Sequence, residues 1–111
     1  MESTFPVQIT FRGVKNQEGL EEAARGHAAN LTRFHPRIHG CFIVIEPAEG
    51  TAHTARLRYR VQLRVAIPGN DVVVANQANR PENEDPFTAL TDTFRVAERQ
   101  LEENDRLRRG R

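Results

Sequence analysis

The alternation of apolar and polar residues is most regular between Thr54 and Ala66, in the sequence TARLRYRVQLRVA. A helix would scatter these residues around its axis, so the segment is predicted to be a half-buried β-strand. One side of the strand is apolar, and the other carries four arginines, Arg56, Arg58, Arg60 and Arg64. This arginine row is either an ordinary solvated sheet face or a surface that faces phosphate groups.

Three further segments have strand patterns. Residues 5–12 alternate with period two, which predicts a first strand. Residues 41–46, CFIVIE, are nearly all apolar, as is typical of a central strand. Residues 72–75 follow a proline–glycine pair in the segment 67–71, in the order that a type II turn favours. The last two strands are therefore expected to form a hairpin.

Between the first and second strands, residues 17–34 change to helical spacing. Asn16 is the predicted N-cap of this helix. Gly26 weakens its middle and is predicted to permit close packing on a sheet. The apolar stripe of the helix consists of Leu20, Ala24, Ala28, Leu31 and Phe34.

A second helix is predicted to begin where Asp85, a good N-cap, precedes Pro86. Asn104 interrupts the apolar stripe of this helix, so its last turns are expected to leave the core. Before it, residues 76–85 are polar and aperiodic, which predicts a mobile loop. Residues 106–111 form a basic tail. The stripe of the second helix consists of Phe87, Leu90, Phe94, Ala97, Leu101 and Leu107.

The order of elements is therefore β-α-β-β-β-α, which predicts an α+β fold in a single domain, residues 1–111, with a core spanning about 5–107. The first two strands should be parallel, because a strand–helix–strand connection of this length forms a right-handed crossover. The other strands should form an antiparallel meander. The economical arrangement is a four-stranded mixed sheet with both helices on one face and the arginine row on the other, open face.

Composition narrows the classes of protein that fit. The chain has 111 residues and one cysteine, Cys41, so an internal disulfide is impossible and a reducing cytoplasm is expected. No apolar run has the length of a membrane span, and the N-terminus lacks signal-peptide features. The formal net charge is only +1, but Lys15 is the sole lysine against fifteen arginines. Arginine makes forked contacts with phosphate, although a genome rich in G and C would favour it equally.

No catalytic constellation is visible, so the chain is predicted not to be an enzyme and to need no cofactor. Glu82, Glu84 and Asp85 lie in the polar loop, where nothing fixes their spacing. His35, His39 and Cys41 match no zinc-ligand spacing and lack a fourth ligand, so no metal site is predicted. His27 is expected to be a packed or surface histidine rather than a general base, and Cys41 to be buried and inert.

A binding surface is the remaining possibility. Basic side chains follow the first strand, surround the first helix and recur along the second helix, where glutamates and aspartates are interleaved with them. These charges fit either nucleic-acid binding or an exposed face stabilised by pairs at i,i+4 spacing. The candidate phosphate contacts are Arg12, Lys15, Arg25, Arg33, Arg37, Arg95, Arg99, Arg106, Arg108 and Arg109.

Several strings of the sequence, taken in order, resemble one family: VQITFRGV, AANLTRFHPRI, LRYRVQLRVAIPG, EDPFTALTDTF and AERQL. The family is that of the ribosome hibernation promoting factors, also called ribosome-associated inhibitors or sigma-54 modulation proteins. The resemblance extends from about Val7 to Arg108. No single string is diagnostic, but the ordered set together with the β-α-β-β-β-α pattern is fairly specific, and the chain resembles the short form of the family.

The resemblance implies a cytoplasmic stress protein that binds the small ribosomal subunit in the channel for mRNA and tRNA and so blocks translation. It implies contacts to the backbone of ribosomal RNA, no cofactor, no small-molecule substrate, no membrane, and a monomer when not bound to the ribosome. Arg37 falls in a family turn and Arg99 in the family's RQL string, while the basic cluster at the family's end corresponds to Arg106, Arg108 and Arg109.

The chain departs from the family in two respects. His27 and Asn30 stand where family members often carry lysine, and the second helix contains more acidic residues than is usual. Each lost phosphate contact weakens binding, so a lower ribosome affinity is expected. Two alternatives stay open: a general double-stranded RNA-binding module, and a protein-interaction domain that uses the open sheet face.

Overall fold

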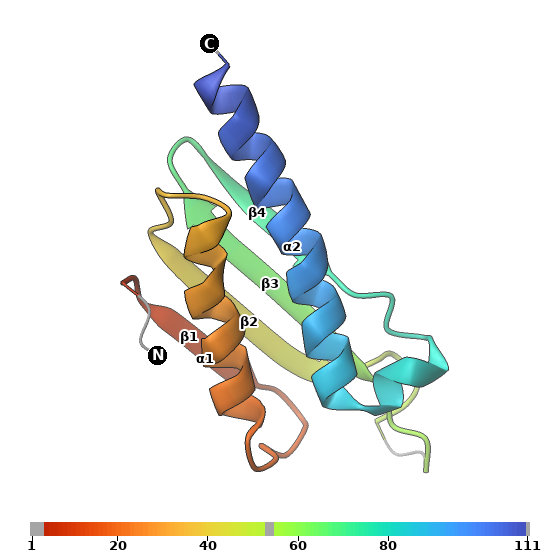
Figure 1. The fold of residues 1–111 in the computed structure, drawn as a ribbon. Helices are drawn as coiled ribbons and strands as arrows, with labels where there is room; N and C mark the ends of the chain where they lie inside the picture. Colours follow the sequence, from red (N-terminus) through yellow and green to blue (C-terminus); the bar gives the residue numbers. More distant parts are fainter. Residues whose placement is uncertain (1–3, 53–54, 111) are drawn as a thin grey trace.

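The computed structural model describes residues 4–52 and 55–110, and in these the predicted fold is confirmed: a four-stranded sheet carries two helices on one face (Figure 1). The strand order is β1-β2-β3-β4, with β1 parallel to β2 and the other neighbours antiparallel. No described helix is apolar over a long enough stretch to cross a membrane. The elements are β1 (Val7–Phe11), α1 (Leu20–Asn30), the 3₁₀ helix η1 (Leu31–Arg33), β2 (Gly40–Pro47), β3 (Tyr59–Ile67), β4 (Asn70–Ala75), the 3₁₀ helix η2 (Pro81–Glu84) and α2 (Pro86–Arg109).

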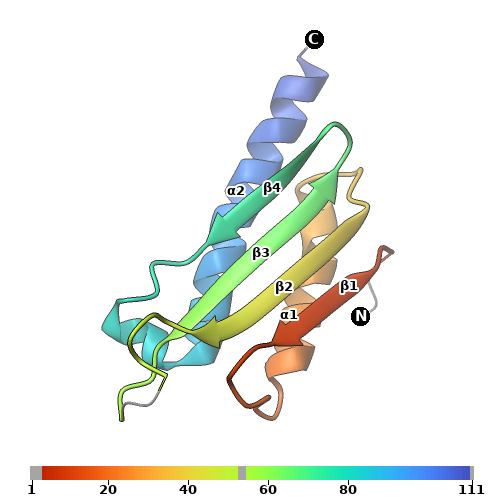
Figure 2. The ribbon, with the colours of Figure 1, turned by 180° about the vertical axis from the view of Figure 1, so that it is seen from behind.

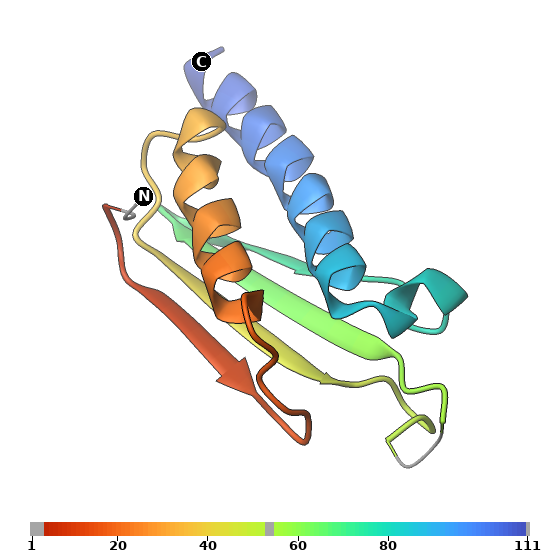
Figure 3. The ribbon, with the colours of Figure 1, turned by 60° about the horizontal axis from the view of Figure 1, so that its bottom comes forward.

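The core lies between the helices and the sheet, as Figure 3 shows from the end of the two layers. Alternate residues of β2 and β3 face this layer, among them Ile43 and Leu63, which are fully buried. Both helices meet them with the predicted stripes, and Phe94 of α2 is the largest fully buried side chain. Since burying a large apolar side chain contributes roughly 1.5–3 kcal/mol, this layer holds the helices on the sheet.

The long strand is shorter than its sequence pattern. The prediction that it begins at Thr54 is wrong for the described residues 55–58, which precede β3, and Thr54 itself lies outside the described residues. The partner strand explains the difference, because β2 pairs with β3 only as far as Pro47 opposite Tyr59. Arg56 and Arg58 therefore lie before the strand, and the predicted ladder of four arginines does not form.

The first helix begins later than predicted. Its N-cap is Gly19, not Asn16, and Gly19 has a positive φ of 82° that a glycine adopts without strain. Gly26 faces solvent, and a Cβ there would have no heavy atom within 4 Å, so the predicted packing of this glycine on the sheet is wrong. The predicted stripe itself is confirmed, since Leu20, Ala24 and Ala28 are fully buried.

The segment 76–85 is not irregular throughout, because it contains η2. Asn76 bonds to the backbone of β3 on both sides of its amide: its Oδ1 accepts from Val61 N–H at 2.9 Å and its Nδ2 donates to Tyr59 O at 2.9 Å. Asn83 is 2% exposed, and its Nδ2 donates to Gln77 O at 2.6 Å. Side-chain amides thus replace the backbone ladder beyond the end of β4.

The second helix begins as predicted, because the Asp85 carboxylate accepts from Phe87 N–H at 2.9 Å and from the Thr88 hydroxyl at 3.2 Å. Two residues of its predicted stripe, Phe87 and Leu107, are exposed. The last turns of α2 extend past the sheet (Figure 1), as Asn104 led us to expect. Residues 106–109 of the predicted tail are helical, and residue 111 lies outside the described residues.

Replacing Asp85 with alanine should lower the free energy of unfolding by about 1 kcal/mol, because the substitution removes the side-chain cap of α2. Urea denaturation followed by circular dichroism measures the change. Glu102→Ala, on the exposed side of the same helix, is the matched control and should change stability by less than about 0.5 kcal/mol. Equal effects of the two substitutions would contradict the capping role.

Candidate nucleic-acid interface

The two helices lie side by side and run in the same direction, so that both present an outer surface away from the sheet (Figures 1 and 3). Two contacts hold α1 and the turn that follows η1 against α2 at different heights. The His27 ring stacks on the Phe94 ring with centroids 5.1 Å apart, and His35 Nε2 lies 3.0 Å from Asn104 Oδ1. The last turn of α1 is thereby placed beside the first half of α2, and the turn that follows η1 beside its C-terminal third.

Arg95, Arg99 and Arg106 form the outer stripe of α2. At 100° per residue their positions fall within about 40° of one another around the helix axis. All three are exposed, and they lie opposite the buried side, which includes Phe94 and Ala97. The predicted sharing of one helix face by these arginines is confirmed.

The basic side chains predicted to contact phosphate differ in whether they already form an ion pair with a carboxylate. Arg108 and Arg109 both pair with Asp105, and the hydrogen bond from Arg108 lowers the pKa of Asp105 below its usual value. Arg106 lies 3.8 Å from Glu103. Among the described residues, the candidates without an ion-pair partner are Lys15, Arg33, Arg37, Arg95 and Arg99.

The fold does not bring all ten candidates to one surface. Arg12 lies 3.9 Å from Glu46 at the open face of the sheet, on the far side from the helices. Arg25 pairs with Glu21 at 3.7 Å and donates to Val7 O at 3.3 Å, so it contacts β1. Lys15 lies in the loop between β1 and α1. The free cations on the helix side are therefore those near the end of α1 and on the outer stripe of α2.

A groove of about 520 Å³ runs between the helices, and we call it the inter-helix groove. Gly26 has no side chain, and no heavy atom lies within 4 Å of the place that a Cβ would take, so the α1 side of the groove is wide at this residue. Asn30 and His27 face the groove, and neither carries a positive charge at neutral pH. Burial lowers the pKa of His27, Arg95 lowers it further, and Glu98 acts in the opposite direction. The lining residues are Ala23, Gly26, His27, Asn30, Arg95 and Glu98.

His35 is a structural residue that the sequence did not reveal. It is 2% exposed, and its Nδ1 accepts from Arg37 N–H at 3.1 Å. Nδ1 is therefore the unprotonated nitrogen of the neutral ring, and Nε2–H donates to Asn104 Oδ1. This bond holds the turn that carries Arg37 against α2. A histidine before a proline gave no signal of such a partner 69 residues away.

The remaining chemical candidates have structural surroundings. Cys41 is fully buried, and burial raises the pKa of its thiol to about 12, so the prediction of an inert cysteine is confirmed. The prediction that His27 is packed is confirmed by its stacking on Phe94. No group of three possible metal ligands is found within residues 4–52 and 55–110.

Figure 2 shows the open face of the sheet. The charge of the predicted arginine row is partly neutralised. Arg64 stacks over the Phe42 ring at 4.3 Å and pairs with Asp71 at 3.1 Å. Arg58 donates to Asn79 O and lies 3.7 Å from Glu84, so it fastens the segment before α2. Arg60 is left exposed on the strand, which makes this face a weaker candidate than the helices.

Comparison with known proteins finds a matching family model and similar solved structures. The family model for "Sigma 54 modulation protein / S30EA ribosomal protein" matches residues 7–109. The N-terminal domain of Protein Y from Thermus thermophilus is similar at 16% identity and a TM-score of 0.67, over 93% of this chain and 98% of that domain. A ribosomal subunit interface protein from Coxiella burnetii is similar at 17% identity and a TM-score of 0.68, over 90% of this chain and 97% of that protein. No curated protein matches the chain.

The stability of the protein should fall as pH decreases from 7.5 to 5, in part because of His27. Its pKa in the folded state lies below that in the unfolded state, so the unfolded state binds more protons in this range and is favoured. His27→Gln removes this component, so its free energy of unfolding should depend less on pH than that of the wild type. Denaturant titrations at each pH measure both curves. If the free energies of unfolding of the wild type and the variant differ by the same amount at every pH, His27 does not contribute to the pH dependence.

Proposed function

We propose that this chain, which belongs to the sigma 54 modulation protein / S30EA ribosomal protein family, binds the small ribosomal subunit through the backbone of its RNA. Membership of this ribosome-associated family confirms the relationship expected from the sequence and agrees with the prediction that the chain is not an enzyme. The proposal concerns which surface makes the contact and what the contact does.

The proposal rests on two guanidinium groups of the outer stripe of α2. Arg95 and Arg99 are exposed and have no carboxylate partner among the described residues. Their charge is therefore available to phosphate, whereas Arg106, Arg108 and Arg109 would first have to leave Glu103 or Asp105. The exposed Arg106–Glu103 pair stabilises by less than about 1 kcal/mol and is easily replaced, whereas Arg108 and Arg109 share Asp105, whose side chain is only 14% exposed. These three arginines therefore contribute as secondary contacts.

The shape of the protein supports a blocking role. It measures 50 × 25 × 19 Å, and α2 with its 24 residues forms the long edge. An elongated body of this kind is suited to lying lengthwise in an RNA-lined channel. We propose that the protein occupies the channel for mRNA and tRNA, as a monomer in the cytoplasm and without a cofactor, and so prevents initiation.

A general double-stranded RNA-binding function fits the charges less well. Such domains meet duplex phosphates with cations, but the segment that leads into α2 carries Glu82, Glu84 and Asp85. Glu84 pairs with Arg58, while Asp85 caps the helix. Two of these three acids are thus held in place by the fold, and the group would repel a duplex.

The double substitution Arg95→Glu/Arg99→Glu should weaken association with small subunits by about 100-fold, if each lost charge-assisted contact contributes roughly 1.5 kcal/mol. The slope of log affinity against log salt should decrease by about 2, roughly one for each phosphate contact. Co-sedimentation with small subunits over a salt series measures both quantities.

The matched control is Arg56→Glu/Arg60→Glu, which makes the same charge change at two exposed arginines away from the helices. It should bind nearly as the wild type does. The wild type, but not the α2 variant, should also prevent mRNA and initiator tRNA from binding to the subunit. Unchanged sedimentation of the α2 variant would exclude this surface, and sedimentation without competition would exclude the blocking role.

Asn30→Lys should tighten binding severalfold, because it adds a cation at the wall of the inter-helix groove without burying it. The salt slope should increase by about 1. Gln8→Lys, on the exposed side of β1, adds the same charge on the opposite face and is the control. An equal gain from both variants would mean that net charge, rather than the groove, determines affinity.

A further inference from the structure

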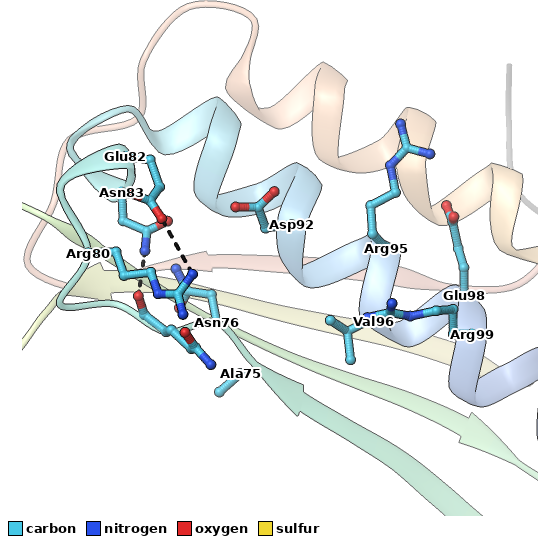
Figure 4. A pocket seen from close by; sticks show the side chains of 11 residues that line it. Ala75, Asn76, Arg80, Glu82, Asn83, Asp92, Arg95, Val96, Glu98 and Arg99 are labelled. Atoms are coloured by element: carbon cyan, nitrogen blue, oxygen red, sulfur yellow. Dashed lines mark hydrogen bonds and ion pairs between the residues drawn. The ribbon is translucent and has the colours of Figure 1, made fainter.

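A second concave site lies on the other side of α2, and we call it the η2 pocket (Figure 4). Its volume is about 720 Å³, within the range of roughly 300–1,000 Å³ that is usual for small-ligand sites. The end of β4 forms its floor, η2 one wall and α2 the other. We infer that this pocket takes one nucleotide of a single RNA strand that runs along α2, an inference that rests on the proposed function.

The wall made by η2 is fixed before any ligand arrives. The oxygen and the nitrogen of the Asn76 side-chain amide both form hydrogen bonds with the backbone of β3, and Asn83 Nδ2 donates to Gln77 O. Arg58 holds the same segment through Asn79 O and Glu84. A pocket that is already formed loses little conformational freedom when a ligand binds.

The cations of the pocket suit a phosphate group. Arg99 lines it from α2 and has no ion-pair partner among the described residues. Arg80 faces it from the opposite wall, and its pair with Glu82 is long, 3.8 Å, and largely exposed, so a phosphate can replace the carboxylate. Figure 4 shows Asp92, Arg95 and Arg99 following one another along α2, across from Arg80 and Glu82.

The acceptors of the pocket suit a base that carries an amino group. Asp92 is exposed at the α2 wall without a bonded partner among the described residues. At the opposite wall the buried Oδ1 of Asn83 has no donor within the described chain, although its Nδ2 is bonded. Because Gln77 O can only accept, the bond from Nδ2 fixes which end of the amide is the oxygen. The Asn83 oxygen is buried, so the exposed Asp92 carboxylate is the acceptor that a base can reach. Adenine, cytosine and guanine offer it an exocyclic amino donor, whereas uracil does not.

The occupant is a strand rather than a free nucleotide because the pocket adjoins the inter-helix groove, with which it shares two lining residues. The two sites lie on opposite sides of the α2 ridge, and Arg95 and Glu98 line both of them. A strand with one phosphate at Arg95 and the next at Arg99 would run along this ridge, because the two residues are one helical turn apart, and its following base would enter the η2 pocket. Glu98 is the single carboxylate common to both sites.

The test is a nuclear magnetic resonance titration of the ¹⁵N-labelled full chain with AMP, CMP, GMP, UMP and ribose 5-phosphate. The amides of residues 77–83 and 92–99 should shift, and UMP and ribose 5-phosphate should bind several times more weakly than CMP. A tetracytidylate should bind at least about tenfold more tightly than CMP, since its neighbouring phosphate reaches Arg95. Equal affinity for monomer and tetramer would overturn the strand, and the absence of shifts would overturn the pocket.

Two substitutions on α2 separate recognition of the base from stability. Asp92→Asn replaces one acceptor oxygen by a donor, so it should narrow the difference between CMP and UMP while melting as the wild type does. Glu98→Gln should strengthen tetracytidylate binding severalfold, and Glu102→Gln, the same change one turn further along α2, should not. If no nucleotide perturbs the pocket but the chain still sediments with small subunits, this inference fails and the proposed function stands.

Discussion

The burial of one side of α2 determines the position of every functional side chain on that helix. Leu90, Phe94 and Ala97 are fully enclosed between the sheet and α1. With 3.6 residues per turn, positions 95 and 99 must then face solvent on the opposite side. The same core residues fix the height of α1, because Phe94 is also the surface on which His27 stacks. The interface is therefore positioned by apolar packing rather than by interactions among the charges themselves.

The arrangement of charges explains how a nearly neutral chain can present a cationic surface. Helix α2 contains five arginines and five carboxylates, so its formal charge is zero. Asp105 and Glu103 engage the arginines of the last turns, while Arg95 and Arg99 keep no such partner among the described residues. What distinguishes the interface is thus which cations are paired, a property that neither composition nor net charge contains.

Periodicity alone identified the strands, both helix stripes and the shared face of Arg95 and Arg99. What it missed depends on contacts between distant segments. The alternating pattern continues upstream of Tyr59, but β3 begins there because its partner β2 ends at Pro47. The bond from His35 to Asn104 joins residues that are 69 positions apart. Neither the η2 pocket nor the inter-helix groove could be predicted, since each is formed by side chains from separate elements.

The small net charge also affects how the protein would find its partner. Strong electrostatic steering requires a field summed over many like charges, and a net charge of +1 does not provide one. The proposed binding to RNA would then depend on short-range contacts made after encounter, to which Arg95, Arg99, the inter-helix groove and the η2 pocket would contribute. Such contacts act on dissociation more than on association. On the proposed function, such a surface would discriminate between RNA structures by geometry, because a generic polyanion would gain little from its few unpaired cations.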